Sequence, residues 1–173
     1  MINQPDKNCI TMPDGSCVSV EPCMHWVINE FKGKYAYLSN FWFLANPILF
    51  DDCYYITVEH AYQAAKTFDK EKRTEIRFTK RPGDAKRLGK RVYFRADWEN
   101  VKLDIMYNLV KQKFEDPVLK SMLLGTDYAT LQEGNWWHDT FWGVDIHTGV
   151  GENHLGKTLM RVRDELRPIP PIK

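Results

Sequence analysis

The sequence lacks any long run of apolar residues. No stretch of its 173 residues approaches the roughly 20 apolar residues that a membrane-spanning helix needs. Its N-terminus also lacks the basic segment followed by an apolar one that marks a secretory signal. We therefore expect a protein of the reducing cytoplasm that has no contact with a membrane.

Neither sign of charge dominates. Lysine and arginine total 24 and aspartate and glutamate 23, so the net charge of +1 gives no electrostatic argument for binding bulk nucleic acid or an anionic membrane. The basic segment 80–95 is still a candidate site for a small anion. The four cysteines contain no C-x-x-C pair. Although Cys9, Cys17 and Cys23 with His25 could be drawn as a zinc site, we expect free thiols and no metal.

No internal repeat or low-complexity segment divides the chain, and its length fits one compact domain. Residues 1–24 are interpreted as an N-terminal extension of unknown role, because two short strand-like stretches flank a Pro-Asp-Gly-Ser turn. Residues 25–167 form the predicted domain, and 168–173 a proline-rich tail. Within the domain, turn and helix signals predict strands at 27–28, 48–50, 54–56 and 130–133, and helices at 57–66, 70–79, 84–89, 98–114, 117–124 and from 154 onward.

The predicted helix 57–66 carries the most chemistry. Thr57 can cap it, its alanines favour helix, and no Gly or Pro interrupts it. On a 3.6-residue period Glu59, Gln63 and Lys66 fall on one stripe, with Tyr62 beside it. A carboxylate and an amine so placed can perform acid, base or imine chemistry. The alternative is a surface helix with a weak charge pair.

Two loops also combine unusual residues. Ser39 and Asn40 lie between apolar residues, either as a buried turn that bonds the backbone or as a ligand-facing loop. Residues 135–143 pack three indoles and a phenyl ring around Asp139, an arrangement that can stack a planar heterocycle or simply close a core. A glycine-containing loop at 149–153 precedes the last helix, where a phosphate could bind.

Short motifs in a fixed order give the chain a resemblance to the YbiA-like family, also called the NADAR family. They are LSNF (38–41), VEHAYQAAK (58–66), KRLGK (86–90), RADWE (95–99), Met106, Lys113-Phe114, DTFWG (139–143) and GENHLGKTLM (151–160). Together they span about four-fifths of the chain. The usual Gly-Arg after the basic helix is Gly89-Lys90 here, which changes how an anion would be held.

The resemblance implies an α+β fold that is mainly helical, and N-glycosidase activity. Family members are associated with hydrolysis of ribosylaminopyrimidine phosphates of the riboflavin pathway, or with removal of ADP-ribose from guanine. We accordingly expect a small ribosyl or ADP-ribosyl substrate, with ADP-ribosylated nucleic acid as a further candidate partner, and no cofactor. The expected catalytic residues are Glu59, Lys66 and Asp139, and the expected substrate contacts are Ser39, Asn40, Tyr62, Gln63, Lys90, Trp98, Trp137, Trp142, Gly143 and Asn153.

Two mechanisms fit these residues. Glu59 can act as the base for a water that attacks C1 of an oxocarbenium-like ribose. Alternatively, Lys66 can attack C1 of the ring-opened sugar and form an imine, while Glu59 moves protons. The imine route is slightly favoured, because a ribosylamine opens readily to a form that a lysine can capture. The alternative from another functional class is a non-catalytic module that binds ADP-ribose or NAD.

Overall fold

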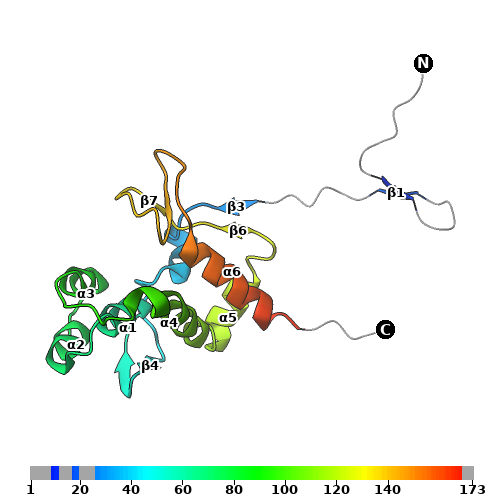
Figure 1. The fold of residues 1–173 in the computed structure, drawn as a ribbon. Coiled ribbons are helices and arrows are strands. Elements are labelled where there is room, and N and C mark those ends of the chain that lie inside the picture. The colour runs from blue at the N-terminus through cyan, green and yellow to red at the C-terminus, as the bar shows by residue number, and fades with distance from the viewer. Residues whose placement is uncertain (1–8, 12–16, 20–25, 169–173) are drawn as a thin grey trace.

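The computed structural model describes residues 9–11, 17–19 and 26–168, and Figure 1 shows helices with a few short strands between them. The α+β, mainly helical fold expected from the sequence is confirmed. In the described part of the chain, the strands pair only two by two, and no helix is both long enough and apolar enough to cross a membrane. The helices therefore build most of the core, and the strands join their ends.

Helix α1 (Val58–Ala65) lies at the centre of one half of the molecule. It packs against α2 (Lys70–Arg77), α3 (Pro82–Gly89) and α4 (Trp98–Lys113). The Thr57 hydroxyl accepts a hydrogen bond from the backbone N–H of His60 and so caps the helix, as predicted. Every residue of α1 is buried, and its small alanines let the neighbouring helices approach closely. The alternative of a surface helix is therefore wrong.

One helix starts earlier than the sequence predicts, and another lacks the side-chain cap that the aspartate before it could provide. Helix α3 begins at Pro82, since a proline at the first helical position needs no N–H partner, and the Asp84 carboxylate binds Arg81 and Arg87 instead of capping. Helix α4 begins at Trp98 as expected. The Asp97 carboxylate, however, pairs with Arg95 and leaves the helix N-terminus without a side-chain cap.

The other half holds α5 (Pro117–Leu124) and α6 (His154–Leu166), which pack on each other, and α6 also packs on α4. A 3-10 helix, η1 (Gly33–Leu38), leads into the loop that carries Ser39 and Asn40. Strand β3 (Val27–Ile28) pairs in parallel with β6 (Thr130–Leu131), and β7 (Gly134–Asn135) with β8 (Val144–Asp145). These two pairs anchor the segment that follows α5.

Two antiparallel hairpins complete the described elements. β4 (Ile48–Phe50) and β5 (Cys53–Tyr55) are joined at Asp51 and Asp52, both of which have the positive φ of a tight two-residue turn. β1 (Cys9–Thr11) pairs with β2 (Cys17–Ser19), so the predicted pairing in the N-terminal extension is confirmed. The turn between these strands lies outside the described residues, as do Cys23, His25 and residues 169–173.

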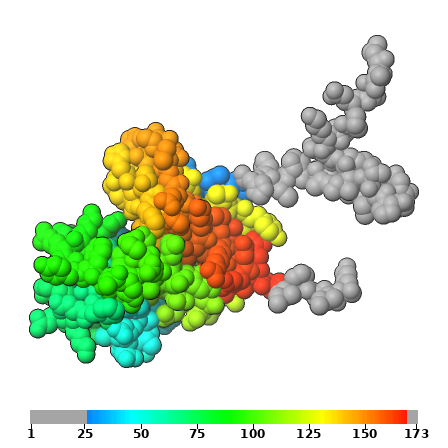
Figure 2. All heavy atoms as spheres, viewed as in Figure 1, coloured from blue at the N-terminus to red at the C-terminus, as the bar shows by residue number. Residues whose placement is uncertain are grey.

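The segment from β6 to the start of α6 forms a lobe. In Figure 2 it is the yellow-to-orange part that stands out from the green helical body. Backbone bonds join its two ends: the N–H of Val144 donates to the carbonyl of Glu133, and that of Asn153 to the carbonyl of Gly143. The aromatic loop is therefore part of a folded unit that faces α1 and α3.

Candidate active site

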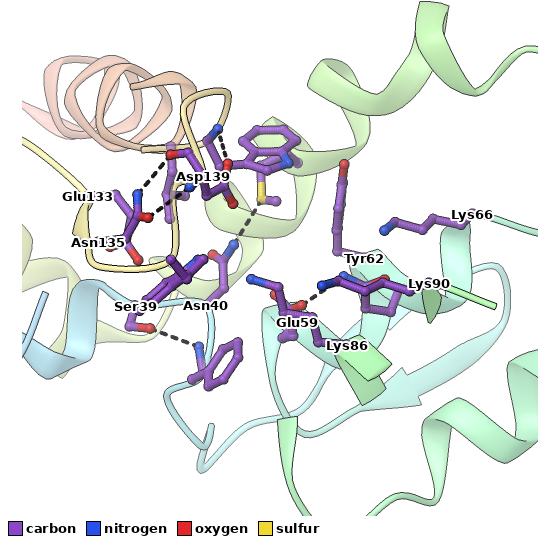
Figure 3. Close-up of a pocket in the computed structure, with 16 residues that line it drawn as sticks. Ser39, Asn40, Glu59, Tyr62, Lys66, Lys86, Lys90, Glu133, Asn135 and Asp139 are labelled. Atoms are coloured by element: carbon purple, nitrogen blue, oxygen red, sulfur yellow. Dashed lines mark hydrogen bonds between the residues drawn. The ribbon is translucent and has the colours of Figure 1, made fainter. Parts of the chain in front are cut away.

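A cavity of about 260 Å³ lies where α1, α3, the loop after η1 and the aromatic loop meet. In Figure 3, Glu59, Lys66, Lys86 and Lys90 come from the helical side, and Glu133, Asn135 and Asp139 face them from the loop side. All three residues expected to be catalytic line the cavity. So do seven of the expected substrate contacts, which are Ser39, Asn40, Tyr62, Gln63, Lys90, Trp137 and Trp142.

Glu59 is the most buried carboxyl group of the cavity. Its side chain accepts a hydrogen bond of 2.8 Å from Nε2 of Gln63, one helical turn further along α1. Burial raises the pKa of Glu59, whereas Lys86, the Gln63 hydrogen bond and Lys66 act in the opposite direction. Burial outweighs the Gln63 hydrogen bond and the two ammonium groups, so the pKa of Glu59 stays above its ordinary value.

Lys66 ends the same stripe of α1. Burial lowers the pKa of its amine to about 8, and repulsion from Lys86 and Lys90 contributes while attraction to Glu59 opposes the shift. Nζ lies 5.5 Å from the ring centre of Tyr62 and 5.4 Å from that of Phe94. At pH 7 about a tenth of such amines are unprotonated, so a nucleophile is available near neutral pH.

The loop after η1 is fixed from two directions. The backbone N–H of Glu59 donates to the carbonyl of Asn40 at 3.0 Å, and the fully buried Lys113 donates from Nζ to the carbonyl of Ser39 at 2.7 Å. Oδ1 of Asn40 is buried without a hydrogen-bond partner at the cavity. Both interpretations of Ser39 and Asn40 are therefore partly met. Oγ of Ser39 accepts a hydrogen bond from the backbone N–H of Phe41, and both residues also line the cavity.

Helix α3 contributes two lysines. Nζ of Lys86 lies 5.4 Å from the ring centre of Trp137 and 6.0 Å from that of Phe41, so aromatic rings flank its ammonium group at the cavity. Lys90, at the end of the same helix, also lines the cavity and is exposed. Their charges make this side of the cavity suitable for an anionic group.

The aromatic loop is held by its own polar side chains. Nδ2 of Asn135 donates to the carbonyls of Asp139 and Val144, while Oδ1 of Asn135 accepts from the N–H of Asp139. The Asp139 carboxylate accepts from the N–H of Trp142 at 2.9 Å. Trp142 packs edge-on against Tyr62, with ring centres 5.3 Å apart, and Trp137 remains 54% exposed. Trp142 therefore packs against the core and also lines the cavity, whereas Trp137 only lines the cavity.

The structure does not bring three of the expected substrate contacts into the cavity. Trp98 is buried behind Tyr62, with ring centres 5.1 Å apart. Gly143 is needed for close packing, because a Cβ there would lie 2.1 Å from the carbonyl oxygen of Glu133. The Asn153 amide donates to the carbonyl of Leu131 and accepts from the N–H of Glu133. Gly143 and Asn153 therefore have structural roles, because both make close contacts with backbone atoms and neither lines the cavity.

Six lining residues were not predicted. They are Phe41, Lys86, Met106, Glu133, Asn135 and Leu155. Five of them lie in segments that the sequence analysis singled out, without a role of their own there, and only Glu133 lies outside all of these segments. Glu133 was interpreted as part of a strand, but β6 ends at Leu131 and leaves Glu133 free to face the cavity. Among the side chains that the structure describes, no three His, Cys, Asp or Glu residues are placed to hold a metal ion.

Comparison with known proteins gives one consistent family. The model of the NADAR domain matches residues 28–167. N-glycosidase YbiA of Escherichia coli (strain K12) is 38% identical over 145 residues, which cover 81% of this chain and 88% of YbiA. The chloroplastic riboflavin biosynthesis protein PYRR of Zea mays is 39% identical over 123 residues, which cover 64% of this chain but only 19% of that longer protein.

The fold agrees with the same assignment. The NMR structure of the E. coli protein YbiA superposes with a TM-score of 0.68 at 35% identity, covering 83% of this chain and 89% of that one. Identity at this level over most of both chains means that the domain around the cavity is shared, and not only the general arrangement of its helices.

Proposed function

The chain belongs to the NADAR domain family and is a hydrolase that acts on N-glycosyl bonds, and from this premise we propose that its substrate is a phosphorylated ribosylamino heterocycle. One observation carries the proposal: a buried carboxyl group, an amine of lowered pKa, aromatic walls and two further lysines surround a single cavity. Each can serve one part of such a substrate.

The aromatic walls suit the heterocycle. Trp137 presents an exposed indole at the cavity, and Tyr62 and Trp142, which pack edge-on against each other, also line it. Rings so placed can stack a planar base. The cavity, at about 260 Å³, lies just below the range of about 300–1,000 Å³ that is usual for ligand pockets, which favours a mononucleotide-sized substrate.

The lysines suit the phosphate. Lys86 and Lys90 present ammonium groups from one helix, and an ammonium group binds phosphate as a point charge. This assignment leaves the ribose between the heterocycle and the phosphate, next to α1. C1 of the ribose would then lie within reach of the groups on the Glu59–Lys66 stripe.

Two routes to hydrolysis remain compatible with this placement. In the imine route Lys66 attacks C1 of the opened sugar, the heterocyclic amine leaves, and water hydrolyses the imine. In the direct route Glu59 removes a proton from the attacking water. The lowered pKa of Lys66 favours the imine route, because a protonated lysine is no nucleophile. Asp139, which lines the cavity opposite, is proposed to bind ribose hydroxyls or the Lys66 ammonium.

ADP-ribosylated guanine is a second candidate substrate. The rim of the cavity carries exposed aromatic rings, Phe41 and Trp137, beside Lys86 of α3. This rim offers contacts to groups that the cavity itself is too small to enclose, such as a second phosphate and an adenosine. A nucleic acid that carries the modified base is the corresponding candidate partner.

A substrate panel tests the proposal. The protein is incubated with a 5-phosphoribosylaminopyrimidine, with ADP-ribosylated guanine and with NAD, and mass spectrometry follows the released ribose 5-phosphate, ADP-ribose and free base. We expect fastest release from the ribosylaminopyrimidine, and little turnover by Glu59→Gln, which keeps the side-chain shape. Release only from ADP-ribosylated guanine would select the second candidate. Full activity of Glu59→Gln would refute the site assignment.

A further inference from the structure

Glu133 has a buried carboxyl oxygen at the cavity that the two routes to hydrolysis do not use. Its side chain lines the cavity, and its Oε2 is buried without any hydrogen-bond partner in the protein. Buried polar atoms are nearly always hydrogen-bonded, and an unpaired one needs an explanation. Here the explanation that fits is a ligand, because this oxygen belongs to a residue of the cavity wall.

The backbone of Glu133 is fixed on three sides. Its N–H donates to Oδ1 of Asn153 at 3.1 Å, and its carbonyl accepts from the N–H of Val144 at 2.9 Å. Gly143 lies so close that a Cβ there would be 2.1 Å from the Glu133 carbonyl oxygen. The side chain is therefore presented from a defined point, as a group that must meet a substrate atom requires.

Glu133 and Glu59 differ in their hydrogen bonding, although burial raises the pKa of both. The pKa of Glu133 is raised to about 7, chiefly by burial and with contributions from Asp139 and Glu59, against the opposing effect of Lys86 and Lys113. Glu59 instead accepts a hydrogen bond from Gln63 and has Lys66 on its own helix. Two carboxyl groups in one site with different donors can take opposite protonation states.

We propose that Glu133 is the catalytic acid that protonates the departing nitrogen of the heterocycle. This inference rests on the proposed function. As the C1–N bond breaks, its electron pair stays on the nitrogen, which receives the carboxyl proton of Glu133. The attacking atom, a water oxygen or the Lys66 nitrogen, forms the new bond to C1 and loses its own proton to Glu59. In the imine route a water then hydrolyses the Lys66 imine and frees the amine. Glu59 finally releases its proton to solvent and Glu133 regains one, so the net reaction consumes one water and no proton.

The test varies the need for protonation. The substrates are N-aryl ribosylamine 5-phosphates whose leaving amines run from 4-methoxyaniline to 4-nitroaniline. A nitroaniline leaves more easily without a proton, so it depends less on an acid. For Glu133→Gln we expect a loss of roughly 10²- to 10⁴-fold in kcat with the methoxy substrate, the usual contribution of a catalytic acid, and a much smaller loss with the nitro substrate.

Two further variants complete the experiment. Glu152→Gln removes a largely exposed carboxyl group outside the cavity and should match the wild type across the series. Glu133→Asp keeps a carboxyl group but places it one methylene further from the substrate, so it should show a weaker form of the same dependence on the leaving group. This variant tests the proposal even if Glu133→Gln does not fold. An equal loss across the series, or none, would overturn the proposal. Wild-type protein that cleaves no member would instead count against the proposed function.

Discussion

The rate of hydrolysis should follow a bell-shaped dependence on pH centred near pH 7.5. The imine route needs the free amine of Lys66, whose pKa is about 8, and the acid step needs protonated Glu133, whose pKa is about 7. Activity therefore rises with pH as Lys66 and the proton acceptor Glu59 lose their protons, and it falls as Glu133 loses its own. Bell-shaped profiles of kcat/KM report such groups in the free enzyme, as apparent values of a coupled site.

The two pKa values set the size of the effect. At pH 7.5 about a quarter of the molecules have Lys66 unprotonated and about a quarter have Glu133 protonated, so about 6% have both. At pH 6 or pH 9 that fraction is about 1%, so kcat/KM should fall about sixfold on either side. The charged groups that act on the two residues are Glu59, Lys86, Lys90, Lys113 and Asp139.

Variants assign the two limbs. Initial rates are measured by mass spectrometry of released ribose 5-phosphate from pH 6 to 9. Glu133→Gln should keep the rise and lose the fall at alkaline pH. Borohydride added during turnover should trap a sugar adduct on Lys66, and Lys66→Arg, which keeps the charge, should be inactive. An active Lys66→Arg enzyme with an unchanged rise and no adduct would refute the imine route and leave the Glu59–water route.

Three other predictions concern the two tryptophans of the cavity wall, the buried Lys113 and the need for a metal ion. Trp137→Ala should raise KM about 5- to 150-fold with little change in thermal stability, because stacking is lost from an exposed ring, whereas Trp142→Ala should also destabilise the fold by about 3 kcal/mol; equal stability losses would contradict the distinction. Burial lowers the pKa of Lys113 from 10.5 to about 7, so its cost is complete below pH 7 and fades as pH rises; urea titration should show wild type gaining about 2 kcal/mol over Lys113→Met between pH 7 and 9, and parallel curves would contradict this. EDTA should leave activity unchanged, and loss of activity that a divalent ion restores would contradict the expectation that the reaction needs no metal.

The α1 stripe could be predicted because its determinants are local. Thr57, the alanines and the spacing of Glu59 and Lys66 fix a capped helix with one chemical face, whatever surrounds it. The aromatic loop was recognisable from residue types alone. What the spacing could not decide was burial: α1 is enclosed by three helices that follow it in the chain, and this enclosure gives Lys66 and Glu59 their altered pKa values.

Glu133 and Asn153 show why the rest of the site was missed. Asn153 precedes a helix after glycines, a pattern typical of a phosphate site, but its amide is used by the backbone at Leu131 and Glu133. Glu133 gave no signal, because its exposure to the cavity depends on where the short β3–β6 pairing stops. The roles of Glu133 and Asn153 depend on contacts between segments that lie 20 or more residues apart in the sequence. The periodicity of helices and strands carries no information about such contacts.

Substrate binding should move the whole pH profile to higher pH, because one cation acts on all three reacting groups. Lys86 lowers the pKa of Glu59, Lys66 and Glu133 alike. A substrate phosphate bound by Lys86 would offset this charge, so both limbs of the bell should shift upward in the complex. The profile of kcat, which reports the complex, should then peak above that of kcat/KM, and Lys86→Met should bring the two peaks together. Coincident peaks in the wild type would show that the phosphate binds away from Lys86.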